Sequence, residues 1–170
     1  MNIYKFIAFG CMAAFLASCS TEYNNSPVVG EWKLTAATIE NAYDFNNDGE
    51  SSNNLMTETG CLLNEFIYFN EDYFGEYRFN TRLEIDWDDA NEVYITSCHE
   101  ETEWPFFVWT YDSGEGSITW QGQGMWGFSF YFSNNTITMT FPDAFEVPVV
   151  TSNGNVVMVA EDLTLVYEKI

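Results

Sequence analysis

The residues best spaced for chemistry lie in the polar stretch DFNNDGESSNN, residues 44–54. A twelve-residue calcium loop takes oxygen ligands from positions one, three, five, seven and nine, and has a glycine at position six. Gly49 matches the glycine, and the five ligand positions are occupied by Asp44, Asn46, Asp48, Glu50 and Ser52. These five residues are therefore a candidate calcium site.

The same stretch departs from the calcium pattern at its end. Leu55 stands where position twelve requires a bidentate acid, and the next acid, Glu58, would serve only a longer loop. Asp and Asn side chains also cap their own backbone in turns that hold no metal. Both interpretations stay open, and calcium binding here would be weak.

The chain offers little for catalysis. His99 is its single histidine, so any Ser-His-Asp or Cys-His site would depend on that residue. There is no Gly-x-Ser-x-Gly pattern and no phosphate-binding glycine loop, and acid pairs arise by chance among 26 Asp and Glu residues. We expect a protein that is not an enzyme and that requires no cofactor.

Two aromatic stretches, WPFFVWTYD and ITWQGQGMWGFSFYF, are the better candidates for binding. The candidate ligand-binding residues are Trp104, Trp109, Trp120, Trp126, Phe128 and Phe130. Such rings can line a cavity for a small apolar ligand, fill a solid core, or form an exposed platform for a sugar or a partner protein. The sequence leaves these three alternatives open.

These side chains must be positioned by strands, because short aromatic and β-branched runs alternate with turn residues from Gly30 onward. The predicted strands are EWKLTAATIE, NEFIYFN, YFGEYRFN, RLEIDW, EVYITSC, FFVWTYD, SITWQG, GFSFYFS, TITMTF, NVVMVAE and LTLVYEK. Alternation in TITMTF places Ile137, Met139 and Phe141 on one face. Turn signals DDAN, SGEG and Asn134-Asn135 predict hairpins between neighbours.

Sequential hairpins form a meander, and closing it removes its exposed edges. We therefore predict an all-β fold, an up-and-down antiparallel barrel of about 8–10 strands, with a sandwich as the alternative. At most one short helix is expected, in the first long loop after Ser51 or Ser52.

The first residues predict export. Lys5 precedes an apolar run, residues 6–17, that is too short to span a bilayer. The run ends in Leu-Ala-Ser-Cys, which resembles the lipobox of bacterial lipoproteins and implies lipidation of Cys19. The expected organisation is a signal peptide over residues 1–18, a tether over 19–28, and one barrel domain over 29–170.

Of the four cysteines, Cys11 would leave with the signal peptide and Cys19 would carry lipid. Cys61 and Cys98 then remain in an oxidising compartment, where one intramolecular pairing is possible. We predict this disulfide, with a catalytic thiol at Cys98 as the competing interpretation.

The chain carries 26 acidic against 5 basic residues, a formal charge of −21. So acidic a protein is excluded from binding nucleic acid. The acids form a self-repelling surface that favours solubility, or else they attract a cation or a basic partner.

Several features in order resemble the lipocalin-like lipoproteins of Gram-negative bacteria. They are the lipobox, Gly30-Glu31-Trp32 opening the first strand, Asp-x-Asn-x-Asp-Gly in a long first loop, and then Cys61 and Cys98. The resemblance implies a small β-barrel behind a lipid anchor, without an established activity, and places Trp32 in the core.

We therefore expect a monomeric lipoprotein of the cell envelope. It would be anchored to the outer membrane through Cys19, face the periplasm or the outside, and bind a small apolar or amphipathic ligand. The alternative is a structural or interaction lipoprotein with a solid barrel core.

Overall fold

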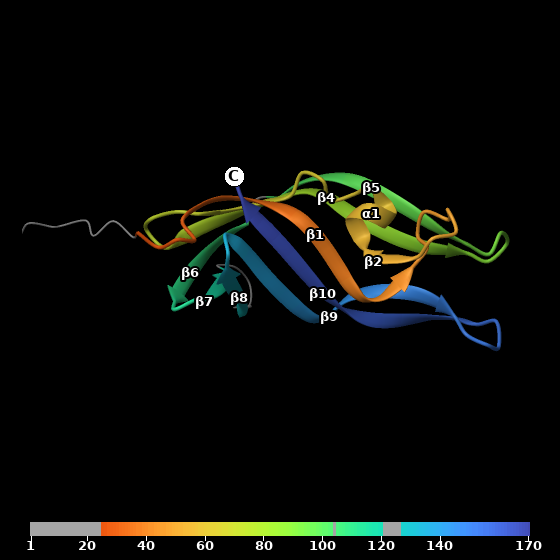
Figure 1. Ribbon diagram of the computed structural model, residues 1–170. Coiled ribbons are helices and arrows are strands. Elements are labelled where there is room, and N and C mark those ends of the chain that lie inside the picture. The colour runs from red at the N-terminus through yellow and green to blue at the C-terminus, as the bar shows by residue number, and fades with distance from the viewer. Residues whose placement is uncertain (1–24, 104, 121–126) are drawn as a thin grey trace, which may run out of the picture.

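The computed structural model describes residues 25–170 apart from residue 104 and residues 121–126; the side chains of residues 103 and 120 are also not described. The described residues form an antiparallel sheet that closes into a barrel, with one short helix beside it (Figure 1). The predicted all-β barrel is confirmed.

Ten strands and one helix are present in the described part of the chain. In order they are β1 (Gly30–Tyr43), β2 (Ser52–Asn54), α1 (Leu55–Thr59), β3 (Phe66–Phe69), β4 (Phe74–Asp88), β5 (Val93–Glu103), β6 (Phe106–Asp112), β7 (Glu115–Trp120), β8 (Gly127–Ser133), β9 (Thr136–Val150) and β10 (Val156–Lys169). Eight strands close the ring in the order β1, β3, β4, β6, β7, β8, β9, β10, and β10 pairs again with β1. The other two pair outside the ring, β2 with β1 and β5 with β4.

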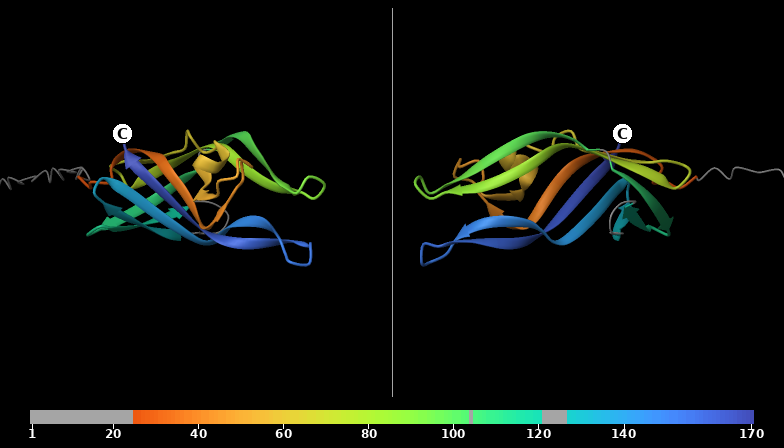
Figure 2. Two further views of the ribbon diagram at one scale, coloured as in Figure 1. Left: turned by 45° about the vertical axis from the view of Figure 1, so that its right-hand side comes forward. Right: turned by 180° about the vertical axis from the view of Figure 1, so that it is seen from behind.

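Two hairpins extend the barrel wall into long arms that project from the same end of the molecule (Figure 2). The β4–β5 arm comprises residues 79–103, and the β9–β10 arm comprises residues 145–161. The described chain begins at the opposite end of the barrel (Figure 1). The barrel is therefore packed at the end where the chain enters and splayed at the other.

The arms arise because β4, β9 and β10 are longer than their sequence suggests, and β9 continues past the predicted TITMTF to Val150. YFGEYRFN and RLEIDW are one continuous strand, β4, and NVVMVAE and LTLVYEK are one continuous strand, β10. Polar residues at both junctions mark shifts of register, between Phe79 and Thr81 and between Glu161 and Leu163, where a turn would otherwise be expected. A bulge bends a strand and changes its twist without ending it.

A buried carboxylate holds the root of the β9–β10 arm against β1. Glu161 is 1% exposed and accepts hydrogen bonds from the backbone N–H and side-chain amide of Asn41 and from the hydroxyl of Tyr43. Burial opposes ionisation of Glu161, but these hydrogen bonds outweigh it and lower its pKa.

The core fills the packed end of the barrel with rings. Phe69 lies against Phe107, Trp109 and Phe130, with centroid separations of 5.4 to 5.5 Å. Two glycines make room for these rings, since a Cβ at Gly75 would lie 2.1 Å from Phe107 and one at Gly116 would lie 2.1 Å from Phe130. The predicted alternation in β9 is also present, with Ile137 and Met139 buried.

Trp32 is fully buried, as predicted for a core residue, and its indole N–H donates to the carbonyl of Val28 at 2.8 Å. The single short helix also lies in the first long loop, as predicted. Its cap is Asn54 and neither of the two serines, because Ser52 belongs to β2 and its hydroxyl accepts from the N–H of Asn54. No described helix has the length and apolar character needed to cross a membrane.

Candidate functional site

An apolar cavity of about 360 Å³, partly open to solvent, lies inside the barrel at the roots of the two arms. Its walls come from β1, β4, β9 and β10, and α1 and the segment after it contribute Leu55 and Leu62. The apolar lining consists of Leu34, Leu55, Leu62, Phe79, Leu83, Phe145, Leu163 and Leu165. Leu83 and Leu163 face this space because alternation runs unbroken along β4 and β10, and the extra residues at both register shifts lie on the partner strands β5 and β9.

Two tyrosine hydroxyls lie at the buried side of the cavity. Tyr77 on β4 and Tyr167 on β10 are nearly fully buried, and their hydroxyl groups are hydrogen-bonded to each other. Burial raises the pKa of both, and the nearby carboxylate of Glu65 raises both further. Both hydroxyls therefore stay protonated at neutral pH, and the pair joins β4 to β10 across a sequence separation of 90 residues.

Glu65, in the segment before β3, is an acid on the wall of this apolar cavity and is 2% exposed. Its two carboxylate oxygens accept from the backbone N–H of Asn80, at 3.2 and 3.0 Å. Burial raises the pKa of Glu65; hydrogen bonds from Asn80 and Thr81 oppose the rise, and the charge of Glu101 adds to it. Glu65 thus fastens β4 opposite the bulge of β5 and places a carboxyl group on the cavity wall.

Thr81, Arg82 and Glu101 complete the polar lining. Glu101 lies on β5 within the bulge opposite residues 79–81. The guanidinium of Arg82 pairs with Glu84, with an Nη2 to Oε1 distance of 3.0 Å, and both side chains are exposed. The positive charge at this wall is therefore already matched by a carboxylate.

The six predicted ligand-binding aromatics are not brought together at this cavity. Trp109 and Phe130 are buried in the packed end; Trp109 donates its indole N–H to the carbonyl of Phe74 at 2.9 Å. Phe128 packs on Phe141, and both line a smaller adjoining space of about 210 Å³. Trp104 and Trp126 lie outside the described residues, as does the side chain of Trp120.

The predicted calcium loop folds as a series of hydrogen-bonded turns. The Asp44 carboxylate accepts from the N–H groups of Asp48 and Gly49 at 3.0 and 2.9 Å, and Asp48 accepts from the N–H of Glu50 at 2.8 Å. Asn46 bonds Asp48 through both its amide oxygen and its amide nitrogen. This is the Asx-turn arrangement that the sequence left open beside calcium binding.

Two further observations describe that loop. Glu58, the acid weighed as a late calcium ligand, is 4% exposed and accepts from the N–H of Phe45 at 3.1 Å. Within the described ranges, no three or more His, Cys, Asp or Glu residues are grouped closely enough to hold a metal ion. Calcium binding by Asp44, Asn46, Asp48, Glu50 and Ser52 remains a prediction.

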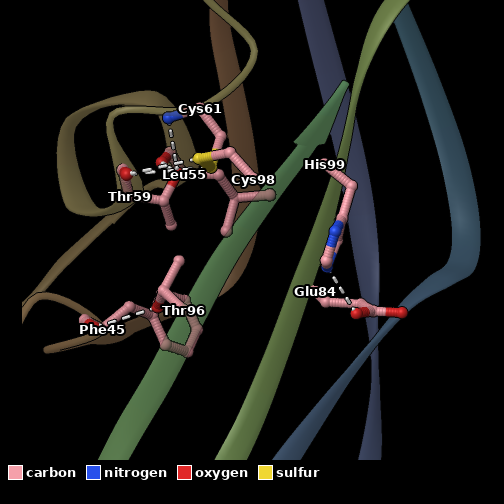
Figure 3. The surroundings of a disulfide bond; sticks show 8 residues. All are labelled: Phe45, Leu55, Thr59, Cys61, Glu84, Thr96, Cys98 and His99. Carbon is pink, nitrogen blue, oxygen red and sulfur yellow. Dashed lines mark hydrogen bonds and ion pairs between the residues drawn. A yellow bond between two sulfur atoms is a disulfide. The ribbon is translucent and has the colours of Figure 1, made fainter. Parts of the chain in front are cut away.

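The predicted disulfide between Cys61 and Cys98 is present, with a Cα–Cα distance of 5.7 Å (Figure 3). It joins the segment after α1 to β5, and so ties the β4–β5 arm to the loop insert. Cys98 is therefore not a free thiol.

His99 bonds Glu84 through Nε2 at 2.8 Å, and both side chains are half exposed (Figure 3).

Sequence reasoning missed the residues that line the cavity. Tyr77 and Tyr167 lie 90 residues apart, and nothing in either local pattern marks a hydroxyl pair. The sequence gives a weak indication of Glu65. This acid directly precedes an aromatic strand, and the alternation of that strand places Glu65 on its inner face.

The chain was compared with protein-family models, with curated proteins and with solved structures, and no match was found.

Proposed function

We propose that this chain is a non-catalytic binding protein that takes one small apolar or amphipathic ligand into the cavity at the roots of the arms. The observation that supports it is the lining, in which aliphatic and aromatic side chains surround a few polar groups. Natural small-molecule sites combine a concave apolar surface with a small number of placed polar groups, in volumes of about 300–1,000 Å³.

The size of the cavity limits the ligand. At about 30 Å³ for each water-sized group, there is room for roughly a dozen non-hydrogen atoms. The adjoining space beside Phe128 shares Tyr77, Phe79, Leu163 and Leu165 with the cavity, so a longer chain can extend along these residues. With the adjoining space of about 210 Å³, the two volumes allow roughly 19 non-hydrogen atoms. The ligand class is therefore a single alkyl chain or a compact aromatic molecule.

We also propose that the barrel is held at the outer membrane by lipid on Cys19, facing the periplasm or the outside. The support is the lipobox pattern and the disulfide, since disulfides persist in oxidising compartments. With the described chain entering at the packed end, the cavity and arms would point away from the anchor (Figure 1).

A contact function is the second candidate, because exposed rings gather on the outer wall. Tyr68 on β3, Phe74 on β4 and Phe106 on β6 are all exposed, Phe106 by 63%. Tyr68 and Phe106 both lie opposite Glu76 in the strand pairing, and are therefore near neighbours on that wall. Such a surface favours stacking on a sugar or packing on a protein.

The binding proposal is tested with the fluorescent apolar probe N-phenylnaphthylamine on the soluble domain and on two tryptophan variants. Leu163→Trp fills the cavity, whereas Val157→Trp adds the same ring to an exposed position of the same strand. We expect saturable one-to-one binding that weakens by about tenfold or more in Leu163→Trp and is kept in Val157→Trp. Absence of saturable binding, or equal binding by both variants with unchanged folding, would overturn the proposal.

A further inference from the structure

The lining of the cavity contains acidic side chains, which binding of a purely apolar ligand would not need. Two acids, Glu65 and Glu101, lie on its wall, and the charge of Glu101 raises the pKa of Glu65. Arg82 is the single basic residue of the described lining, and Glu84 pairs with its guanidinium. The two acids are therefore left on the wall without a basic residue of the described lining to neutralise them.

Burial raises the pKa of Glu65, and a cation beside it would stabilise its ionised form. Glu65 is 2% exposed, so its carboxylate acts in a medium where water screens it poorly. A hollow that is lined by one sign of charge and has apolar walls focuses the field into its interior. The rest of the molecule adds to the same sign, with a formal charge of −21.

Such a cavity is unfavourable for an anionic head group. A fatty acid would bring a third carboxylate beside Glu65 and Glu101, with its own desolvation cost. A cation in the same place would separate the two acids and be attracted to both. Hydrogen bonds already hold Glu65 in position, so little reorganisation would accompany binding.

Resting on the proposed binding function, we infer that the cavity selects an amphiphile with a cationic ammonium head group, which pairs with Glu65 and Glu101 while its apolar part lies against Leu163, Leu165 and Phe145. Anionic amphiphiles of the same length are rejected. The site is thus specific for charge as well as for apolar surface.

The test compares decylammonium with decanoate. Each molecule contains ten carbon atoms in an unbranched chain, and the two differ in the sign of the head-group charge. Each displaces N-phenylnaphthylamine from the cavity at neutral pH in about 0.15 M salt, where attraction to distant surface charges is screened. We expect decylammonium to displace the probe at a concentration about tenfold lower than decanoate, the scale of one partly buried charge contact.

Two variants locate the charge that is responsible. Glu101→Gln removes one lining acid and is expected to reduce the preference about threefold or more. Glu71→Gln removes the same charge from an exposed position in the turn between β3 and β4, and should leave the preference unchanged. Glu65→Gln is a further variant, checked for folding because Glu65 also binds Asn80.

The outcomes separate the two proposals. If the probe binds but decanoate displaces it as well as decylammonium does, the inference about charge is wrong and the binding function stands. If Glu71→Gln and Glu101→Gln reduce the preference equally, the selectivity belongs to the whole acidic surface and the inference is again wrong. If the probe itself does not bind, both proposals fail together.

Discussion

At the scale of single residues, the hydroxyl pair of Tyr77 and Tyr167 is the group whose loss is easiest to measure. A buried hydroxyl that loses its partner keeps its desolvation cost, about 1–3 kcal/mol, whereas removing both partners of a hydrogen bond is closer to neutral. Tyr167→Phe should therefore lower the free energy of unfolding by about 1–3 kcal/mol. The double variant Tyr77→Phe/Tyr167→Phe should cost less than the two single changes together, as measured by urea unfolding. Strict additivity of the single changes would contradict a direct bond.

The same pair predicts a loss of stability at high pH. Burial raises the pKa of both tyrosines above the value of about 10 that they have in the unfolded chain. The folded state then holds its phenolic protons more tightly, so this stabilisation is complete below about pH 10 and is lost as the pH rises above it. Urea unfolding between about pH 8 and 11 should show a steeper fall for the unmodified protein than for the double phenylalanine variant. Parallel pH curves would show that the pair does not titrate in this way.

The loop of Asp44 and Asp48 makes a prediction about calcium affinity. Leu55 removes the bidentate ligand of the standard loop, and Glu58 is engaged with Phe45. We expect calcium to bind no more tightly than about 10⁻⁴ M. Calorimetric titration measures the affinity, and Asp44→Asn/Asp48→Asn is the control that should remove any heat of binding. A dissociation constant in the micromolar range would contradict the prediction.

At the scale of elements, the disulfide controls the β4–β5 arm, because Cys98 lies on β5 and Cys61 lies next to α1. Cys61→Ala/Cys98→Ala should lower the free energy of unfolding by about 2–5 kcal/mol, since the bond closes a loop with a sequence separation of 37 residues. Backbone amide exchange should also become faster in β5 than in β7, which the bond does not touch. Equal exchange in β5 with and without the bond would show that strand pairing alone holds the arm.

Much of the element order can be predicted from local pattern. Alternation and turn residues predict the hairpins correctly, including the two-residue turn at Asn134 and Asn135, both of which have positive φ. The continuous strands β4 and β10 could not be predicted, because a polar residue at a bulge and one at a turn look alike in sequence. What distinguishes them is a distant partner, such as the carboxylate of Glu65 on the N–H of Asn80.

The candidate site was harder to predict than the fold for the same reason. Trp109 and Phe130 were selected by residue type, yet the close approach allowed by Gly116 places Phe130 in the packed end. The cavity forms where the arms splay, and its lining joins strands that are distant in the sequence, which no local pattern brings together. Residue type alone therefore led to a prediction of ligand binding and did not locate the cavity.

At the scale of the whole molecule, the barrel has two different ends. The packed end holds the ring cluster around Phe69 and receives the described start of the chain, and the other end carries both arms (Figure 2). The tips of the arms face a common hollow of about 650 Å³, lined in part by Trp87, Val150 and Val156. The hollow between the arm tips therefore lies at the same end of the barrel as the cavity.

Because the two ends differ, the proposed anchor would orient the barrel. Lipid on Cys19 would hold the packed end near the bilayer and direct the arms outward. Cys19→Ala should abolish membrane attachment and block processing of the leader, because firm binding requires two or more acyl chains. Cys11→Ala changes a cysteine of the same segment that the lipobox does not involve, so it should leave attachment unchanged. Fractionation of washed membranes, with the mass of the mature N-terminus, measures both effects. If Cys19→Ala stayed in washed membranes and only detergent released it, another part of the chain would bind lipid. The packed end would then not be the attachment point, and the cavity would have no reason to face away from the membrane.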